Sequence, residues 1–143
     1  MESAILGLVL DSSIIIDAER KHQTVEELLQ SIQQRFGEIE IVMSAVTVAE
    51  LVHGIARANT AEIRDRRRAF INELKKHVPV HSVTDATAEI AGTVGGEEAA
   101  KGNTLPIDDL LIGASAIDLG YAVSTLNLRH FEKIPGLKVI TLA

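Results

Sequence analysis

The sequence predicts an α/β fold, in which one domain has a mostly parallel central sheet flanked by helices. Short apolar segments suited to buried strands alternate with longer segments of helical periodicity over the whole chain. The chain has 143 residues, a length that suits one domain with a sizeable core. No repeat, linker or low-complexity segment interrupts the alternation, so we treat residues 1–143 as one domain.

The strands and helices follow from two patterns. Apolar runs, several of them rich in β-branched residues, predict strands at residues 5–10, 39–43, 121–124 and 137–142, and residues 78–80 are expected to be short and extended. A repeat of three and four residues predicts helices at 14–20, 25–36, 45–58, 61–77, 85–101 and 110–119, and a helical turn at 128–132.

Cap and turn residues support several of these boundaries. Thr24 followed by Glu27 is a capping-box pattern at the start of a helix, and Gly37 is a suitable end. Ser44 is a plausible cap for the helix at 45–58. The helix at 85–101 contains glycines that each weaken it by about 1 kcal/mol relative to alanine. The helix at 110–119 is apolar nearly all round, and we expect Gly113 to let it pack close to the sheet.

Composition narrows the functional classes. No apolar run reaches the ~18 residues of a membrane span, and the N-terminus lacks a secretion pattern, so we expect a cytoplasmic protein without a membrane segment. The absence of cysteine excludes disulfides and thiolate metal sites. The net charge of −6 disfavours a dedicated nucleic-acid binder, which is usually basic. It permits an enzyme that acts on phosphodiesters, because bound divalent cations reverse the local charge.

Acidic and amide side chains converge on one edge of the predicted sheet. Asp11 and Asn127 follow strands, Asp108 and Asp109 precede the helix at 110–119, and Glu50 lies on the helix after the second strand. The carboxyl ends of parallel strands meet at one edge, where sites are built. Oxygen ligands suit Mg²⁺ or Mn²⁺, whereas packed carboxylates without a cation repel each other and have raised pKa values.

Each of these residues also has a purely structural explanation. Asp11 could cap the helix that follows it. Glu50 could be an ordinary solvated helix residue. Asp108 and Asp109 could stabilise the dipole at a helix start, by ~0.3–1 kcal/mol each. Asn127 could be a turn residue. The set is therefore more informative than its members.

Four segments in order resemble PIN domains, most closely the VapC-type toxins of bacterial toxin–antitoxin pairs. The segments are Leu10–Ser13 (LDSS), Ser44–Gly54 (SAVTVAELVHG), Asp109–Ala114 (DLLIGA) and Ser124–Phe131 (STLNLRHF), and the ending Ile134–Val139 (IPGLKV) also resembles that family. Together they span essentially the whole chain.

This resemblance implies an endoribonuclease that depends on Mg²⁺ or Mn²⁺. Asp11, Glu50 and Asp109 match the three acids of the family and would be its catalytic and metal-binding residues. Asn127 falls where some members have a fourth acid and many have asparagine. Ser13 matches a small polar residue that supports the first aspartate, and Asp108 matches no required position.

The resemblance also implies in-line attack that leaves a 5′-phosphate and a 3′-hydroxyl on RNA held by its backbone and unpaired bases. Candidate RNA contacts near the motifs are Arg57, Arg129 and His130. The basic patch at residues 66–68 is expected to be a solvated helix face.

The expected partners are RNA, a VapB-like antitoxin and a second copy of the chain in a homodimer. We hypothesise that an antitoxin tail covers the helices at 14–20, 25–36 and 45–58, where Ile15, Leu28 and Ile55 would be exposed. A basic side chain of that tail, of which arginine is the best suited, would then lie among Asp11, Glu50 and Asp109.

Three alternatives remain open. A housekeeping RNA-processing nuclease would share the same fold. A PIN-like module that binds RNA or a partner without cleavage is disfavoured by the presence of all three acids. A phosphatase or receiver-like switch with Asp11 as nucleophile would require a second acid nearby and a downstream lysine, but position 13 is Ser13 and no lysine follows a suitable strand.

Overall fold

Five parallel strands form the centre of the computed structural model, which describes residues 5–142. The strands are β1 (Gly7–Leu10), β2 (Glu40–Ser44), β3 (Val80–His81), β4 (Ala122–Thr125) and β5 (Val139–Thr141). Their order in the sheet is β3-β2-β1-β4-β5, so β1 is central and pairs with both β2 and β4. The chain runs outward from β1 to one edge and then returns to the other side. The predicted α/β fold with a parallel sheet is confirmed.

Helices connect every pair of consecutive strands. They are α1 (Ser12–Arg20), α2 (Val25–Phe36), α3 (Ala45–Ala56), α4 (Ala61–His77), α5 (Asp85–Ala100), α6 (Ile107–Leu119) and α7 (Leu128–Phe131). The capping box is present: Thr24 Oγ1 accepts from the Glu27 backbone N–H at 3.0 Å, and Glu27 Oε1 accepts from the Thr24 N–H at 2.9 Å. Ser44 caps α3 as predicted.

The start of α6 differs from its prediction. We placed it at Leu110, where the apolar pattern begins, but the helix starts at Ile107 with Pro106 as its N-cap residue. A polar first turn has no apolar periodicity, so the pattern missed it. Asp108 and Asp109 therefore lie inside the first helical turn.

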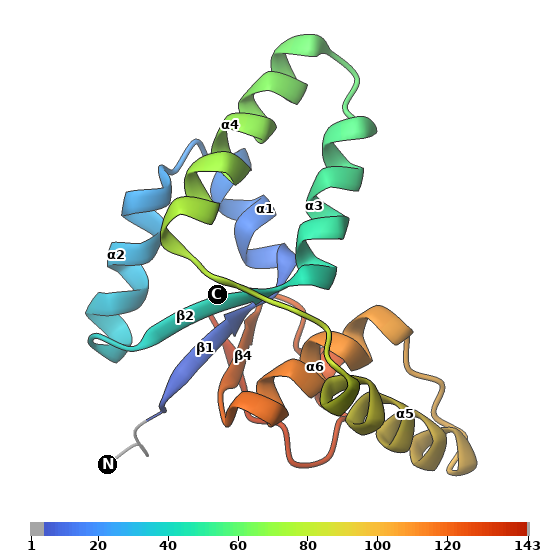
Figure 1. The fold of residues 1–143 in the computed structure, drawn as a ribbon. Coiled ribbons are helices and arrows are strands. Elements are labelled where there is room, and N and C mark those ends of the chain that lie inside the picture. The colour runs from blue at the N-terminus through green and yellow to red at the C-terminus, as the bar shows by residue number, and fades with distance from the viewer. Residues whose placement is uncertain (1–4, 143) are drawn as a thin grey trace.

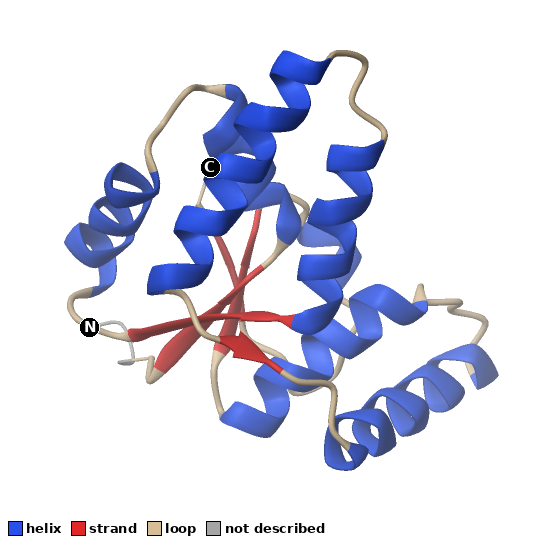
Figure 2. Ribbon diagram, turned by 45° about the horizontal axis from the view of Figure 1, so that its top comes forward, coloured by secondary structure: helices blue, strands red, loops and turns tan. Residues whose placement is uncertain are grey.

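The sheet separates two groups of helices (Figures 1 and 2). In β1, Leu8 and Leu10 belong to the core shared with α1–α4, and Val9 belongs to the core shared with α5 and α6. Successive side chains of a strand point to opposite faces, so a fully apolar β1 fills both cores. This explains why its sequence reads as an unbroken apolar run.

Two glycines allow helices to approach their neighbours closely. A Cβ at Gly95 of α5 would lie 2.9 Å from Leu110 Cδ1 of α6. A Cβ at Gly113 would lie 2.8 Å from Ile134 Cδ1 and 3.3 Å from Leu137 Cδ2. The expectation that Gly113 serves contact with the sheet was therefore wrong, because the close neighbours are in the segment after α7.

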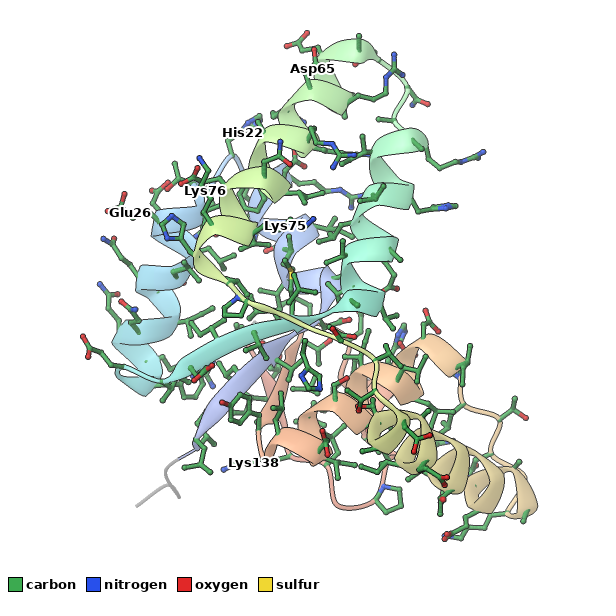
Figure 3. The ribbon with its side chains drawn as sticks, in the orientation of Figure 1. His22, Glu26, Asp65, Lys75, Lys76 and Lys138 are labelled. Atoms are coloured by element: carbon green, nitrogen blue, oxygen red, sulfur yellow. The ribbon has the colours of Figure 1, made fainter. Side chains whose placement is uncertain are left out.

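The basic patch of α4 is only partly a solvated face. Arg66 Nε lies 2.7 Å from Oε1 of the buried Glu19 in α1, and Arg67 Nη1 donates to the Gly54 carbonyl of α3 at 2.8 Å. Arg68 is exposed. Asp65, at the end of α4 farthest from the sheet in Figure 3, is also exposed. Two arginines thus join α4 to α1 and α3. Arg66 and Arg68 are exposed as expected, whereas Arg67 is half-buried, which corrects the expectation of solvation for that residue.

Among residues 5–142, no helix combines the length and apolar character required to cross a membrane.

Candidate active site at the carboxyl ends of β1 and β4

Asp11 directly follows β1 and is held by two hydroxyl groups. Its side chain is 5% exposed, and its Oδ2 accepts from Ser13 Oγ at 2.7 Å and from Thr125 Oγ1 at 2.8 Å. Asp11 occupies the N-cap position of α1 but makes no side-chain cap hydrogen bond. The capping explanation is therefore wrong. The carboxylate is oriented by Ser13 in the first turn of α1 and, across the sheet, by Thr125 at the end of β4.

Backbone amides orient both hydroxyls. Ser13 Oγ accepts from the Leu126 N–H at 3.0 Å, and Thr125 Oγ1 accepts from the Asn127 N–H at 2.9 Å. With these amides as donors to the hydroxyl oxygens, the hydroxyl protons are available to Asp11. The structure thus brings Ser13 to Asp11 as expected. Our sequence reasoning missed Thr125, although its place at the end of a buried strand was a usable signal.

Glu50 lies on α3 and faces the other acids. Burial is the main cause that raises the pKa of Glu50 from 4.5 to about 7, and the nearby charges of Asp108, Asp11 and Asp109 contribute to the same rise. Its Oε1 has no accessible surface and no hydrogen-bond partner among residues 5–142. Glu50 is therefore not an ordinary solvated helix residue.

Asp109 lies in the first turn of α6 and is 7% exposed. Its pKa is raised from 3.8 to about 6, mainly by burial. The charges of Asp108 and Asp11 also raise it, and the charge of His130 lowers it. His130 Nδ1 lies 3.4 Å from Asp109 Oδ2. A carboxylate that only stabilised a helix dipole would have a lowered pKa. The raised pKa reflects burial first and the neighbouring charges of Asp108 and Asp11 second.

The remaining predicted residues lie at different distances from this cluster. Asn127 is exposed, and its side chain makes no hydrogen bond with the described residues. Arg129 and His130 are exposed on α7, where His130 contacts Asp109. Arg57 is exposed at the C-cap of α3, about two helical turns beyond Glu50. It is the least close of the three candidate RNA contacts.

The oxygen donors suit a divalent cation. Asp11, Glu50 and Asp109 supply only carboxylates, the ligands that Mg²⁺ and Mn²⁺ prefer. Each has an oxygen without a hydrogen-bond donor in residues 5–142, because both donors to Asp11 bind Oδ2 and Asp109 contacts only His130. Within that same range, no three acids or histidines are gathered as closely as the ligands of one ion. The match between this site and a divalent cation therefore rests on the carboxylate oxygens that the three residues offer and on the repulsion between them that a cation would relieve.

An apolar pocket lies beside the acids, between α1, α3 and α4. Its walls include Ile16, Leu51 and Phe70, and Glu50 lines it together with Arg67. The helices expected to present an apolar surface are instead well covered. Ile15, Leu28 and Ile55 are 1%, 4% and 8% exposed, which corrects our expectation that they form an open groove. Pairs of helices bury these side chains against the sheet.

The buried carboxylates lie at the carboxyl ends of parallel strands where the strand order reverses, which is the place where open α/β sheets bind their ligands. The sequence matches the PIN domain over residues 8–137, and the chain belongs to that family. It is similar to Ribonuclease VapC1 of Rickettsia felis, with 29% identity over 138 residues that cover 96% of this chain and 98% of that protein. It is also similar to the tRNA(fMet)-specific endonuclease VapC of Shigella flexneri, with 27% identity and coverage of 93% and 96%.

Solved structures show the same fold. VapBC2 from Rickettsia felis bound to a DNA fragment from its promoter contains a chain that matches with a TM-score of 0.83 and 20% identity, covering 96% of this chain and 99% of that one. DNA-bound VapBC from Salmonella typhimurium contains another, with a TM-score of 0.80, 23% identity and coverage of 97% and 100%.

Proposed function

We propose that this protein is a divalent-cation-dependent endoribonuclease and the toxin of a type II toxin–antitoxin pair. The observation that carries the proposal is the convergence of Asp11, Glu50 and Asp109 at the switch point of a PIN-domain sheet. Support comes from relatives named as VapC ribonucleases, which align over nearly their whole length. Retention of all three acids favours cleavage over a role limited to binding.

In this mechanism, Asp11, Glu50 and Asp109 would hold Mg²⁺ or Mn²⁺. The bound cation would supply a nucleophilic hydroxide near neutral pH and neutralise charge on the phosphate under attack. Ser13 and Thr125 keep the Asp11 carboxylate in one orientation through their two hydrogen bonds. In-line attack would leave a 5′-phosphate and a 3′-hydroxyl.

The chain also offers contacts for the RNA backbone. Arg129 and His130 lie on α7 beside Asp109 and would bind phosphates that flank the scissile bond. Arg57 would bind further along the strand. Unpaired bases in a loop offer edges that a duplex hides, so single-stranded or looped RNA is the proposed substrate class.

Cleavage of single-stranded RNA by the purified protein tests this function. We expect cleavage with Mg²⁺ or Mn²⁺, none in excess chelator, and none from Asp109→Asn prepared in parallel. End-labelling of the products should reveal 5′-phosphates. Full activity in chelator would reject the cation-dependent mechanism. Activity retained by Asp109→Asn would show that a contaminating nuclease cut the RNA or that this acid is not required.

We further propose a cytoplasmic protein that forms a homodimer and is silenced by a VapB-like antitoxin. The solved VapBC complexes of the same fold support this partner. The pocket between α1, α3 and α4 suits an amphipathic antitoxin segment, and its Glu50 would accept an arginine from that segment. High Mg²⁺ should weaken antitoxin binding if arginine and cation share the acids. Antitoxin binding that changes neither with Mg²⁺ nor with Asp11→Asn would place the inhibitor elsewhere.

Light scattering tests the proposed homodimer, and a monomer at micromolar concentration would reject it.

A further inference from the structure

Basic side chains follow one another on α7 and the turn after it. Arg129 and His130 belong to α7, and the backbone stays helical for one residue beyond that helix, up to Lys133. Side chains three and four positions apart share one face of a helix, which places Lys133 beside both. All three residues are exposed, and His130 Nδ1 lies 3.4 Å from Asp109 Oδ2. A row of basic groups thus begins at the acids of the candidate site and leads away from them.

A hydrogen-bonded network joins Lys133 to the loop between α5 and α6. Glu98, near the end of α5, is 5% exposed and accepts from Lys101 Nζ and from Asn103 Nδ2, each at 3.1 Å. Asn103 Oδ1 in turn accepts from Lys133 Nζ at 3.4 Å. The Asn103 amide therefore directs its N–H group to an anion and its oxygen to a cation, as its donor and acceptor atoms require. This network restricts the position of the Lys133 ammonium group before any ligand binds.

The charges of the network leave one of its two lysines without an acidic partner. Lys101 forms an ion pair with Glu98, and Lys101 and Asn103 together lower the pKa of that carboxyl group, which is therefore ionised at neutral pH. Lys133 makes no ion pair within residues 5–142 and contacts a neutral amide instead. Glu132, the acid beside it in the chain, is exposed and also makes no ion pair within that range. The positive charge of Lys133 is thus available to an anion.

Stabilisation of the fold does not account for Lys133. Its hydrogen bond to Asn103 is long and exposed, and contacts of this kind contribute little to the free energy of unfolding. The segment is anchored by its apolar neighbours: Phe131 and Ile134 are 0% and 4% exposed and belong to the core shared with α5 and α6. Lys133 therefore projects into solvent from a turn that apolar packing already holds in place.

We propose that Lys133 binds a phosphate group of the RNA and extends the RNA contacts of α7 toward the loop between α5 and α6. This inference rests on the proposed function, because it assigns a further contact to the same substrate. A lysine holds a phosphate by charge and reads no base, and its placement by Asn103 lowers the side-chain entropy that binding costs.

The proposal also gives the RNA strand a direction. Phe131 of α7 packs with α5 and α6, whereas the apolar pocket lies between α1, α3 and α4, and the sheet separates these two groups of helices (Figures 1 and 2). A strand that runs from Asp109 over His130 to Lys133 leaves the acids on the side away from that pocket.

Binding of a fluorescein-labelled single-stranded RNA of about 12 nucleotides, followed by anisotropy at several KCl concentrations with Mg²⁺ present, tests the proposal. Every protein is full-length and carries Asp109→Asn, so that the RNA stays intact. Lys133→Gln removes the charge but keeps a donor for Asn103, and Lys133→Arg keeps the charge. Lys138→Gln is the matched control, since this exposed lysine lies near Leu6, before the start of β1, as Figure 3 shows.

We expect Lys133→Gln to weaken RNA binding about three- to tenfold at low salt. The slope of log affinity against log salt should fall in magnitude by about 0.7, the value for one phosphate contact to a single strand. Lys133→Arg and Lys138→Gln should match the parent protein in both quantities. All four proteins should share one melting temperature, because the contact with Asn103 contributes little to stability.

Affinity and salt slope of Lys133→Gln equal to those of Lys138→Gln would overturn the inference and leave the nuclease proposal intact. Weaker binding with an unchanged salt slope would also overturn it, since the loss would not then come from a phosphate contact. A lowered melting temperature and weaker binding in both Lys133→Gln and Lys133→Arg would assign the lysine a structural role instead. Absence of RNA binding by the parent protein would overturn the proposed function itself and, with it, this assignment.

Discussion

Thr125 Oγ1 donates a hydrogen bond to Asp11 Oδ2 over 2.8 Å and so joins the carboxyl ends of β4 and β1. These strands are neighbours in the sheet but lie 114 residues apart in the chain. The bond orients the buried Asp11 carboxylate at the point where the strand order reverses. The position of the central acid therefore depends on the pairing of β1 with β4.

Substitution of Thr125 by valine should weaken the site with little change in shape. The variant loses one donor to a buried carboxylate, so we expect a loss of about 1–3 kcal/mol in the free energy of unfolding and a lower kcat with a nearly unchanged KM. Urea denaturation and steady-state cleavage measure the two effects. Thr93→Val, at an exposed position of α5, is the control and should behave like wild type. Equal stability of the two variants would show that the hydrogen bond does not matter.

Neutral substitutions of the three acids should affect activity and stability differently. Asp11→Asn, Glu50→Gln and Asp109→Asn should each reduce cleavage by more than about a hundredfold, beyond the 10–100-fold typical of supporting residues, and Asn127→Ala should be milder. In chelator, Glu50→Gln and Asp109→Asn should raise the melting temperature, because burial and repulsion raise the pKa of both groups. Asp11→Asn should not, since two hydroxyls stabilise that carboxylate. A destabilised Glu50→Gln would contradict the repulsion argument.

The stability of the cation-free protein should fall as pH rises toward neutrality. The pKa of Glu50 rises from 4.5 to about 7 on folding, and that of Asp109 from 3.8 to about 6. Within this window the unfolded chain releases these protons first, so the folded state binds more protons and loses stability with increasing pH. Melting temperatures in chelator between about pH 4 and pH 7.5 should show the decline. Glu50→Gln should flatten it, and a slope identical to wild type would refute the assignment to Glu50.

The link between α1 and α4 should contribute to stability through Arg66. Glu19 is 6% exposed and lies 2.7 Å from Arg66 Nε, so removal of the guanidinium leaves a buried carboxylate with only Arg67, at 4.0 Å. We expect Arg66→Ala to cost about 1–3 kcal/mol. Arg68→Ala, which removes an exposed arginine of the same helix without an acidic partner in the described chain, should stay within about 0.5 kcal/mol of wild type. Chemical denaturation of both variants decides whether the ion pair stabilises the fold.

Arg129 should contribute to RNA binding and not to chemistry. It is exposed on α7, next to the residue that contacts Asp109. Arg129→Ala should raise KM several-fold, leave kcat nearly unchanged, and reduce the salt dependence of binding, because one phosphate contact is lost. Arg57→Ala should have a smaller effect, and Arg68→Ala none. A fall in kcat without a change in KM would assign Arg129 to the reaction itself.

Local patterns accounted for most of the elements. The capping box of Thr24 and Glu27 and the cap at Ser44 were correct because they involve residues within three positions of each other. The start of α6 was wrong because its first turn carries Asp108 and Asp109, which show no apolar repeat. The acidic residues could be named from the sequence since a carboxylate after a buried strand is costly unless it is partnered.

The sequence by itself determined the class of fold, the strands and helices, and the three acids that match the PIN pattern. The tertiary structure alone decided which side chains meet: Thr125 with Asp11 across 114 positions, and Arg66 with Glu19 across 47. Secondary structure is set largely by interactions within a few residues, which a sequence displays directly. Contacts between distant residues depend on strand order and helix packing, and these are established only when the whole chain buries its apolar faces together.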